Sequence, residues 1–437
     1  MLNRSSPAAS GLAALAHEAY VFTLPLVVME TLRRRRMALG PMNQMFHARR
    51  LLTHKSREIT TPNNDTLYSN AWIDLRDRPA RIELPAAGGR YLSVALMDMW
   101  TDNFAVLGGR ATGAEGGVFT IIGPDDAARG LEGQVIRAPT PVIWVLARIL
   151  VDGPQDLAAA REVQNGLRLE AAPPRNGPEG DPAEATRSAP WEVYFAQAAR
   201  LMATNRPRAT DLALLRRIAP LGLEDGEAWD PARFSSHEAQ EIEAGVAAAK
   251  ARLRTGIGGG LGGGAARAGG WAAPSAKLGL YGEDYALRAR VAVGGLGALP
   301  LVEATYFSAA AFGGVPLDGR RPMRSRIPGD APLPVDAFWS LSMYAPTDDG
   351  ELFFVDNPID RYAIGDRTPG LETEADGSLV ILIGHADPGD GRRANWLPAP
   401  DGPCTLVLRA YHPRRELLDG RRMPPEPEPI FMEETDR

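Results

Sequence analysis

Residues 60–74 read TTPNNDTLYSNAWID and combine a polar turn with the start of an apolar strand. Pro62 restricts the residue before it to extended conformations, and the Asn-Asn-Asp that follows favours a tight turn. The alternating residues 67–73 predict a strand that enters a hydrophobic core. The turn would place two carboxamides, one carboxylate and the phenol of Tyr68 near one strand end. Polar groups this dense beside an apolar run form either a hydrogen-bonded scaffold or a functional site.

The length and composition indicate a multidomain globular protein. At 437 residues, two or three domains are expected, and a hydrophobic fraction of 44% is enough for a sizeable core. The net charge of −6 and the pI near 5.7 argue against nucleic-acid binding, which normally needs a basic face. We therefore expect a small-molecule ligand as partner, and self-association into a homo-oligomer stays open.

An apolar stretch near the N-terminus, residues 20–29 (YVFTLPLVVM), is too short to span a bilayer and contains Pro25. Its flanking charges run against a secretion signal, because Glu18 precedes it and residues 33–36 are all Arg. We expect an amphipathic helix over about residues 11–33, kinked at Pro25, with the arginines at its end. The arginines could touch anionic lipid, but a solvated helix end is favoured. The sequence thus predicts a cytoplasmic protein without stable membrane insertion.

The apolar periodicity predicts four regions. Residues 1–58 hold the first helix and a loop, and residues 59–150 read as an antiparallel β domain. Helical periodicity fills residues 151–300, and strands return from about Phe338 in a second β domain, residues 301–437. We expect strands at 81–84, 91–97, 118–122, 142–150, 339–344, 352–355, 379–384 and 405–411. We expect helices at 156–169, 191–204, 211–218, 236–254 and 283–295, and flexible loops at 171–190 and 255–270.

The common catalytic motifs are missing. The chain has no phosphate-binding loop ending in Gly-Lys-Ser/Thr and no Gly-x-Ser-x-Gly elbow. Residues 258–263 match a dinucleotide fingerprint only formally, because they follow a helix rather than a strand. The six histidines are scattered, so we expect neither a zinc site nor a cofactor, although carboxylate-bound Mg²⁺ or Ca²⁺ stays open. The single Cys404 lies in an apolar run and reads as a buried structural thiol.

Residues 97–103, MDMWTDN, form a second polar group. If the preceding strand continues through them, Asp98, Trp100 and Asp102 project to one face, about 13 Å from the first Cα to the last. Together with Asp65 this gives up to three carboxylates, and neighbouring carboxylates raise one another's pKa. The alternative is that these residues cap turns and pair with arginines such as Arg90, Arg110 or Arg148.

A further candidate wall lies in residues 139–148, where alternation places Trp144 and Arg148 on one face. An aromatic ring with a cation can hold an anionic or planar ligand. The alternative is a core tryptophan beside an arginine that pairs with a carboxylate. Towards the C-terminus, Arg361 and Trp396 lie in loops that either line a cavity or join domains.

Five stretches resemble a two-part bacterial family: PNNDTLYSNAWIDL, RYLSVALMDMWTDNFAVLG, APTPVIWVLARI, NPIDRYAIGDRT and NWLPAP. Its halves are domain of unknown function twelve-fifty-four and domain of unknown function twelve-fourteen, and the likeness covers roughly residues 15–170 and 280–425. The resemblance implies a multidomain α and β fold with two antiparallel β-sandwich-like domains, the second holding an inserted α-helical domain. The chain departs from the family pattern in lacking a secretion signal and in having Met423 where an aromatic is usual.

The resemblance implies no activity, so two hypotheses are drawn from the residues. The first is a cofactor-independent hydrolase or lyase that uses carboxylate and tyrosine acid–base chemistry on a small organic molecule. Its catalytic residues would be Asp65, Tyr68, Asp98 and Asp102, and its substrate-binding residues Asn63, Asn64, Trp100, Trp144, Arg148, Arg361 and Trp396. The second is a non-catalytic protein for small-ligand binding or assembly. In the first, residues 62–68, 98–102 and 144–148 should converge on one cavity.

Overall fold

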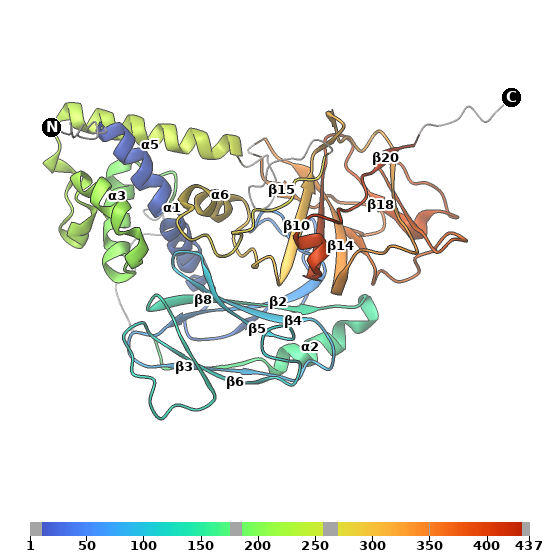
Figure 1. Ribbon diagram of the computed structural model, residues 1–437, viewed down its shortest axis with the longest axis horizontal. Coiled ribbons are helices and arrows are strands. Elements are labelled where there is room, and N and C mark those ends of the chain that lie inside the picture. The colour runs from blue at the N-terminus through green and yellow to red at the C-terminus, as the bar shows by residue number, and fades with distance from the viewer. Residues whose placement is uncertain (1–10, 175–185, 257–269, 349, 431–437) are drawn as a thin grey trace, which may run out of the picture.

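The structure is a computed structural model that describes residues 11–174, 186–256, 270–348 and 350–430. Figure 1 shows a β region at the bottom, a group of helices at the upper left and a second β region at the upper right. Helix α1 lies among the helices although it precedes the first β region in sequence. The element order is thus a helix, strands, helices and strands, as predicted. The expected loops at 171–190 and 255–270 lie largely outside the described residues, and the formal fingerprint at 258–263 lies wholly outside them.

The first β region contains two sheets. Their strand orders are β1-β2-β8-β4-β5 and β7-β6-β3-β9, and their strand pairs are antiparallel except for the parallel β6–β7 pair. The four strands predicted between residues 81 and 150 are present within one residue at each end. The strand bounds are β1 Phe46–His47, β2 Thr66–Asp74, β3 Ala80–Leu84, β4 Leu92–Asp98, β5 Asn103–Gly108, β6 Gly117–Ile122, β7 Gln134–Arg137, β8 Val142–Leu150 and β9 Arg168–Glu170.

Alternation along the central strands gives the five-stranded sheet two different faces. Leu67 and Val145 share a hydrophobic core with Ile82 of the other sheet. Trp72 and Trp144 point the other way, into a core shared with the helices and the second β region. Of the candidate site residues, this second face carries Tyr68, Trp144 and Arg148.

Helix α1 (Leu12–Met37) lies at the centre of the helical group, against α3 (Trp191–Thr204), α5 (Ser236–Gly256) and α6 (Tyr285–Gly294). The prediction of an amphipathic helix is wrong, because residues 22–27 are all buried and an apolar surface is needed on every side. Among the described helices, α1 alone is long and apolar enough to cross a membrane, and 61% of that stretch is buried within the protein.

The remaining helices also follow the sequence pattern closely. Helix α5 has a capping box at its start: Ser235 Oγ donates to Glu238 Oε2 at 2.7 Å, and Glu238 N donates back to Ser235 Oγ at 3.4 Å. The helix expected at 156–169 ends earlier, because its last residues form strand β9. The other helices are α2 Leu157–Gly166, α4 Leu212–Ile218 and α7 Arg415–Leu418, with 3-10 turns such as Ala209–Asp211 between them.

The second β region starts at Ala304, earlier than the expected Phe338. One sheet has the order β10-β19-β14-β15 with β16 also paired to β14, and the other has the order β18-β17-β13-β20. The strand bounds are β10 Ala304–Ala309, β11 Ala311–Phe312, β12 Val315–Pro316, β13 Met323–Ile327, β14 Val335–Pro346, β15 Leu352–Phe353, β16 Ala363–Gly365, β17 Leu379–Gly384, β18 Trp396–Pro398, β19 Thr405–Pro413 and β20 Glu428–Pro429.

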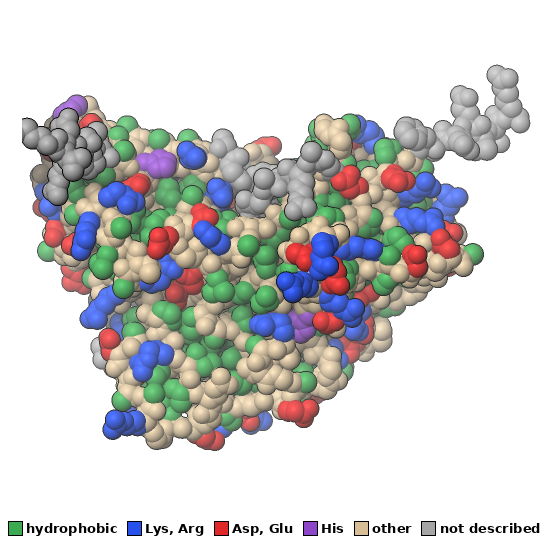
Figure 2. Space-filling view, in the orientation of Figure 1, with side chains coloured by type: hydrophobic (Ala, Val, Ile, Leu, Met, Phe, Trp, Pro, Cys, Tyr) green, Lys and Arg blue, Asp and Glu red, His purple; other side chains and the backbone are tan. Residues whose placement is uncertain are grey.

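One hydrophobic core joins all three parts. It contains Phe22 of α1, Trp144 of the first β region, Phe195 of the helices and Phe338 and Tyr411 of the second β region. The parts therefore pack as one body rather than as separate domains on linkers. On the face shown in Figure 2, basic and acidic side chains are interleaved rather than gathered by sign.

Candidate functional site

The turn before β2 has a strained backbone. Thr61 has φ = 57°, a left-handed conformation that a β-branched residue rarely adopts. Its N–H donates to Leu352 O at 2.7 Å, and its carbonyl accepts from Arg409 Nη2 at 3.0 Å. Tyr344 Oη donates to the next carbonyl, that of Pro62, at 2.5 Å. The second β region therefore holds this turn in a conformation that the turn would not adopt alone, as is common at functional sites.

Asp65 at the end of this turn is half-buried, with its carboxyl group against strand β14. Ser340 Oγ donates to Asp65 Oδ2 at 2.6 Å. Burial raises the pKa of Asp65 above its usual value, although Ser340 and the nearby Arg409 oppose the change. Burial, with a smaller contribution from Asp65, also raises the pKa of Asp366 to about 6. The turn thus presents a carboxyl group whose proton affinity is shifted towards neutral pH.

Tyr68 and Arg148 are cross-strand neighbours on β2 and β8. The Arg148 guanidinium carbon lies 5.5 Å from the centre of the Tyr68 ring. Arg148 Nη2 donates to Gly297 O at 2.6 Å, while its buried Nη1 has no hydrogen-bond partner among the residues that the structure describes. This contact brings together two of the three segments that were expected to converge, residues 62–68 and 144–148.

The second β region adds four residues to the group. The register of β10, β19 and β14 sets Tyr306, Arg409 and Ser340 side by side. Tyr411 Oη accepts from Asn63 Nδ2 at 2.7 Å, which ties this sheet to the turn before β2. We name this group the seam, and its members are Asp65, Tyr68, Arg148, Tyr306, Ser340, Arg409 and Tyr411.

The expectation that Asp98, Trp100 and Asp102 lie along one strand is wrong. Strand β4 ends at Asp98, and the chain turns at Thr101, which has φ = 71°. Asp98 Oδ1 accepts from the backbone N–H groups of Trp100 at 2.9 Å and Asp102 at 3.0 Å. Burial and then the charge of Asp102 raise the pKa of Asp98 to about 7. Asp98 is thus the residue that shapes the turn, which matches the alternative of turn capping.

Asp102 connects the first β region to the helices. Its Oδ2 accepts from Arg288 Nη2 at 2.8 Å and Arg208 Nη1 at 3.2 Å, and its Oδ1 accepts from Tyr281 N at 2.9 Å. Trp100 Nε1 donates to Asn205 O at 3.2 Å within the helical core. The carboxylate does pair with arginines, but they are not those named from the sequence.

The convergence of all candidates on one cavity is also wrong. Thr66 pairs with Leu150, whereas Asp98 pairs with Ile143 on the same strand β8. The two positions are thus seven residues apart, roughly 23 Å along a strand. Trp144 lies near the Asp98 end and stacks on Trp72, with ring centres 5.9 Å apart.

The other predicted binding residues have structural partners. Asn64 Nδ2 donates to Leu52 O at 2.5 Å. Arg361 Nη1 donates to three backbone carbonyls, including Trp396 O at 2.8 Å, and Trp396 Nε1 donates to Gly384 O at 2.9 Å. Arg361 and Trp396 therefore lie together in the second β region, and no described hydrogen bond connects either to the seam.

Two features bear on metal and thiol chemistry. Within the described ranges, His54, Asp356 and Asp360 are the three residues whose ligand atoms lie within 4.8 Å of one another. Both aspartates are exposed, and His54 Nδ1 is already within 2.7 Å of Tyr362 Oη. Cys404 is buried and free, and burial raises the pKa of its thiol to about 12, as expected for a structural cysteine.

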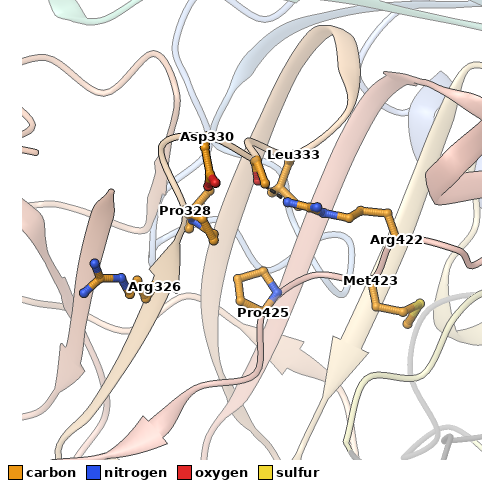
Figure 3. A pocket seen from close by; sticks show the side chains of 9 residues that line it. Arg326, Pro328, Asp330, Leu333, Arg422, Met423 and Pro425 are labelled. Atoms are coloured by element: carbon orange, nitrogen blue, oxygen red, sulfur yellow. Dashed lines mark hydrogen bonds between the residues drawn. The ribbon is translucent and has the colours of Figure 1, made fainter. Parts of the chain in front are cut away.

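A cavity of about 290 Å³ lies in the second β region, away from these residues. Figure 3 shows Met423 and Pro425 on one side, Pro328 and Leu333 around it, and Arg326 extending away from the other side chains. Its arginines already have partners, because Arg326 pairs with Asp376 and Arg422 donates to Ala331 O. Met423, the departure from the family pattern, therefore lines a mainly apolar hollow.

Sequence reasoning missed the contribution of the second β region. Arg409 is a charged residue within the apolar run TLVLRAY of strand β19, and it is 3% exposed. An arginine in the middle of a fully buried strand is rare, and that signal could have found it. Tyr306 and Ser340 carry no comparable signal, because tyrosine and serine are common in strands.

The seam residues fall within two regions that match known sequence families. The family described as Protein of unknown function (DUF1254) matches residues 42–171, and the family described as Protein of unknown function (DUF1214) matches residues 303–415. No curated protein matches the sequence.

Two solved structures are similar to the chain. The VPA0106 protein from Vibrio parahaemolyticus is 19% identical with a TM-score of 0.71, over 96% of this chain and 100% of that chain, so it shares the fold. An uncharacterized protein from Burkholderia cenocepacia is 14% identical with a TM-score of 0.45, over 94% of this chain and 87% of that chain. On the strength of the two family matches, the chain belongs to the family in which an N-terminal DUF1254 domain is joined to a C-terminal DUF1214 domain.

Proposed function

We propose that the protein is a cofactor-independent enzyme, a hydrolase or a lyase, that performs acid–base chemistry on a small organic molecule at the seam. The observation that carries the proposal is Asp65, a buried carboxyl group whose pKa is raised and which has no ion-pair partner among the described residues. Structural carboxylates are normally paired when buried, whereas catalytic ones are held with a proton affinity near working pH.

The roles follow from the contacts. Asp65 is the general base, and Ser340 Oγ, 2.6 Å from Oδ2, holds its carboxyl group in one orientation. Tyr68 is the proton donor, because its ring lies 5.5 Å from the Arg148 guanidinium that would hold the ligand. Asn63 fixes the turn by accepting from Asp65 N at 2.5 Å through its Oδ1. Asp98 and Asp102 receive no role in this proposal, because their turn and interregion contacts account for them.

The alternative is a non-catalytic protein for small-ligand binding or assembly. The alternative is favoured by hydrogen bonds at and beside the seam that also bridge the two β regions, such as Asn63 to Tyr411 and Tyr344 to the Pro62 carbonyl. In that case the seam would serve as a contact surface, and a shifted carboxyl pKa would have no function.

A metabolite screen by mass spectrometry separates these proposals. Wild type, Asp65→Asn and Asp98→Asn are incubated with a cell extract, after circular dichroism has shown that each is folded. We expect wild type and Asp98→Asn to consume the same metabolite, and Asp65→Asn to be about 100-fold slower or more.

Each other outcome has a defined meaning. Turnover retained by Asp65→Asn contradicts the proposed base. Loss in Asp98→Asn alone would move the chemistry to the Asp98 turn. A complete absence of turnover in wild type, with binding of a metabolite instead, would favour the alternative.

We further propose the finer architecture and setting. Each β region is a β-sandwich-like domain, and the helices are an insertion in the second; the support is that in each region two sheets share one core. The protein would act in the cytoplasm without a cofactor, and carboxylate-bound Mg²⁺ or Ca²⁺ and homo-oligomer formation stay open.

A further inference from the structure

The seam contains two buried arginines and one carboxyl group, Asp65, which acts on Arg409 through its charge but forms no ion pair with either arginine in the described residues. Arg148 is 6% exposed, and its Nη1 has no hydrogen-bond partner in the described part of the chain. Arg409 is 3% exposed and donates to Ser342 Oγ at 2.8 Å and to the carbonyls of Thr61 and Pro62. Neither arginine forms an ion pair with an acidic side chain of the described residues. A buried charge left unpaired is strongly unfavourable, so this arrangement calls for an anion.

The hydroxyl groups near Arg148 are also short of acceptors. Tyr306 Oη accepts from Leu299 N at 3.3 Å, and Tyr411 Oη accepts from Asn63 Nδ2 at 2.7 Å. In each case the hydroxyl's own proton has no acceptor among the described residues. Both phenols are close enough to Arg148 to raise the pKa of its guanidinium group, which stays charged. The seam therefore holds several hydrogen-bond donors that have no acceptor among the described residues.

The charge and surroundings select the kind of anion. The free donors are one guanidinium nitrogen and two neutral hydroxyls, which suits a single negative charge better than the two charges of a phosphate. Aromatic residues pack next to these donors: the ring centres of Tyr411 and Phe338 lie 4.1 Å apart, and those of Tyr91 and Tyr411 lie 5.1 Å apart. An aromatic neighbourhood favours a ligand with an apolar body.

We propose that the seam binds the carboxylate group of a small organic acid, which accepts hydrogen bonds from Arg148 Nη1 and from the hydroxyls of Tyr306 and Tyr411. This inference rests on the proposed function, because it names the substrate class of the same site. The carboxylate would anchor the ligand at Arg148 and leave its body beside Tyr68 and Asp65.

The test uses the full chain and a panel of monocarboxylates, from acetate to decanoate together with benzoate and phenylacetate. Benzamide serves as the neutral counterpart, and chloride, sulfate and inorganic phosphate are measured at the same ionic strength. Binding is followed by thermal shift and titration calorimetry for wild type, Arg148→Met and two controls. Arg288→Met removes an equally buried arginine that is paired with Asp102, and Arg206→Met removes an exposed one.

We expect at least one monocarboxylate, but not benzamide, to bind wild type, with a Kd about tenfold or more weaker in Arg148→Met. Without ligand, Arg148→Met should melt at the same or a higher temperature, because an unpaired buried charge is removed. Arg288→Met should melt lower and, like Arg206→Met, keep the carboxylate affinity.

The inference is overturned if no carboxylate of the panel binds wild type, if Arg148→Met binds as wild type does, or if an inorganic anion binds as tightly as the carboxylates. Asp65→Asn separates this result from the proposed function, since it should keep carboxylate binding and lose turnover. Lost turnover in Asp65→Asn with unchanged binding in Arg148→Met would refute the inference alone. Carboxylate binding without any turnover would refute the enzyme alone.

Discussion

At the scale of single residues, Asp98 couples stability to pH. Its pKa is raised to about 7 in the folded protein, while in the unfolded chain it takes its ordinary value near 4. The stability that its proton contributes is complete below about pH 4 and is lost as the pH rises through 7, because the unfolded state releases the proton first.

Asp98→Asn should remove this dependence while its side-chain oxygen still accepts the two turn N–H groups. In urea unfolding between pH 4 and 8, the free energy of unfolding of the variant should rise relative to that of wild type by on the order of a few kcal/mol, with no further rise above pH 7. The exposed Asp390→Asn is the control and should follow wild type. The linkage would be disproved if the free energies of unfolding of Asp98→Asn and wild type changed with pH in the same way.

Residue pairs within one sheet could be predicted from the sequence, and pairs between sheets could not. Strand alternation placed Trp144 and Arg148 on one face of β8, because alternation depends only on local backbone geometry. Arg409 meets Thr61 across 348 residues, and nothing in either local pattern records that contact. The Asp98 turn was missed because it depends on Thr101 at φ = 71°, which a threonine rarely adopts.

At the scale of elements, the helices were predictable and the short strands were not. α3 (Trp191–Thr204) has the predicted bounds because its apolar repeat and its Pro190 start agree. β10 (Ala304–Ala309) was missed because ATYFSA is buried on both faces and so shows no alternation. The burial of α1 on all sides was missed because it depends on which helices surround it.

Helix α1 should therefore be the element most sensitive to truncation of a side chain. Phe22 is 1% exposed and lies between the rings of Trp100 at 4.8 Å and Tyr285 at 5.3 Å. Phe22→Ala should lower the free energy of unfolding by about 3–5 kcal/mol, measured by urea titration with circular dichroism. Arg35→Ala on the exposed side of the same helix should change it by less than about 0.5 kcal/mol. Equal effects at the two positions would mean that α1 is not part of the core.

At the scale of the whole molecule, the shared core predicts cooperative unfolding. The core links all three parts, and the Asp102 carboxylate and the seam bridge the same boundaries with polar contacts. Calorimetry should show a single heat-absorption peak whose van't Hoff and calorimetric enthalpies agree. In variants that keep a single tryptophan, Trp144, Trp191 or Trp339, tryptophan fluorescence should give the same midpoint of unfolding. Separate midpoints would show that the parts unfold as independent domains.

The hydrogen bond from Arg409 to the carbonyl of Thr61 has a consequence for biosynthesis. The two residues are 348 positions apart, so at roughly 5–20 residues per second the arginine leaves the ribosome about 20–70 s after the turn that it braces. During that interval Thr61 lacks the donor that keeps it left-handed. A nascent chain can pair its first strands early, but it completes this turn only when translation of strand β19 is done. A product whose translation stops just before strand β19 would thus contain most of the polypeptide but could not assemble the site.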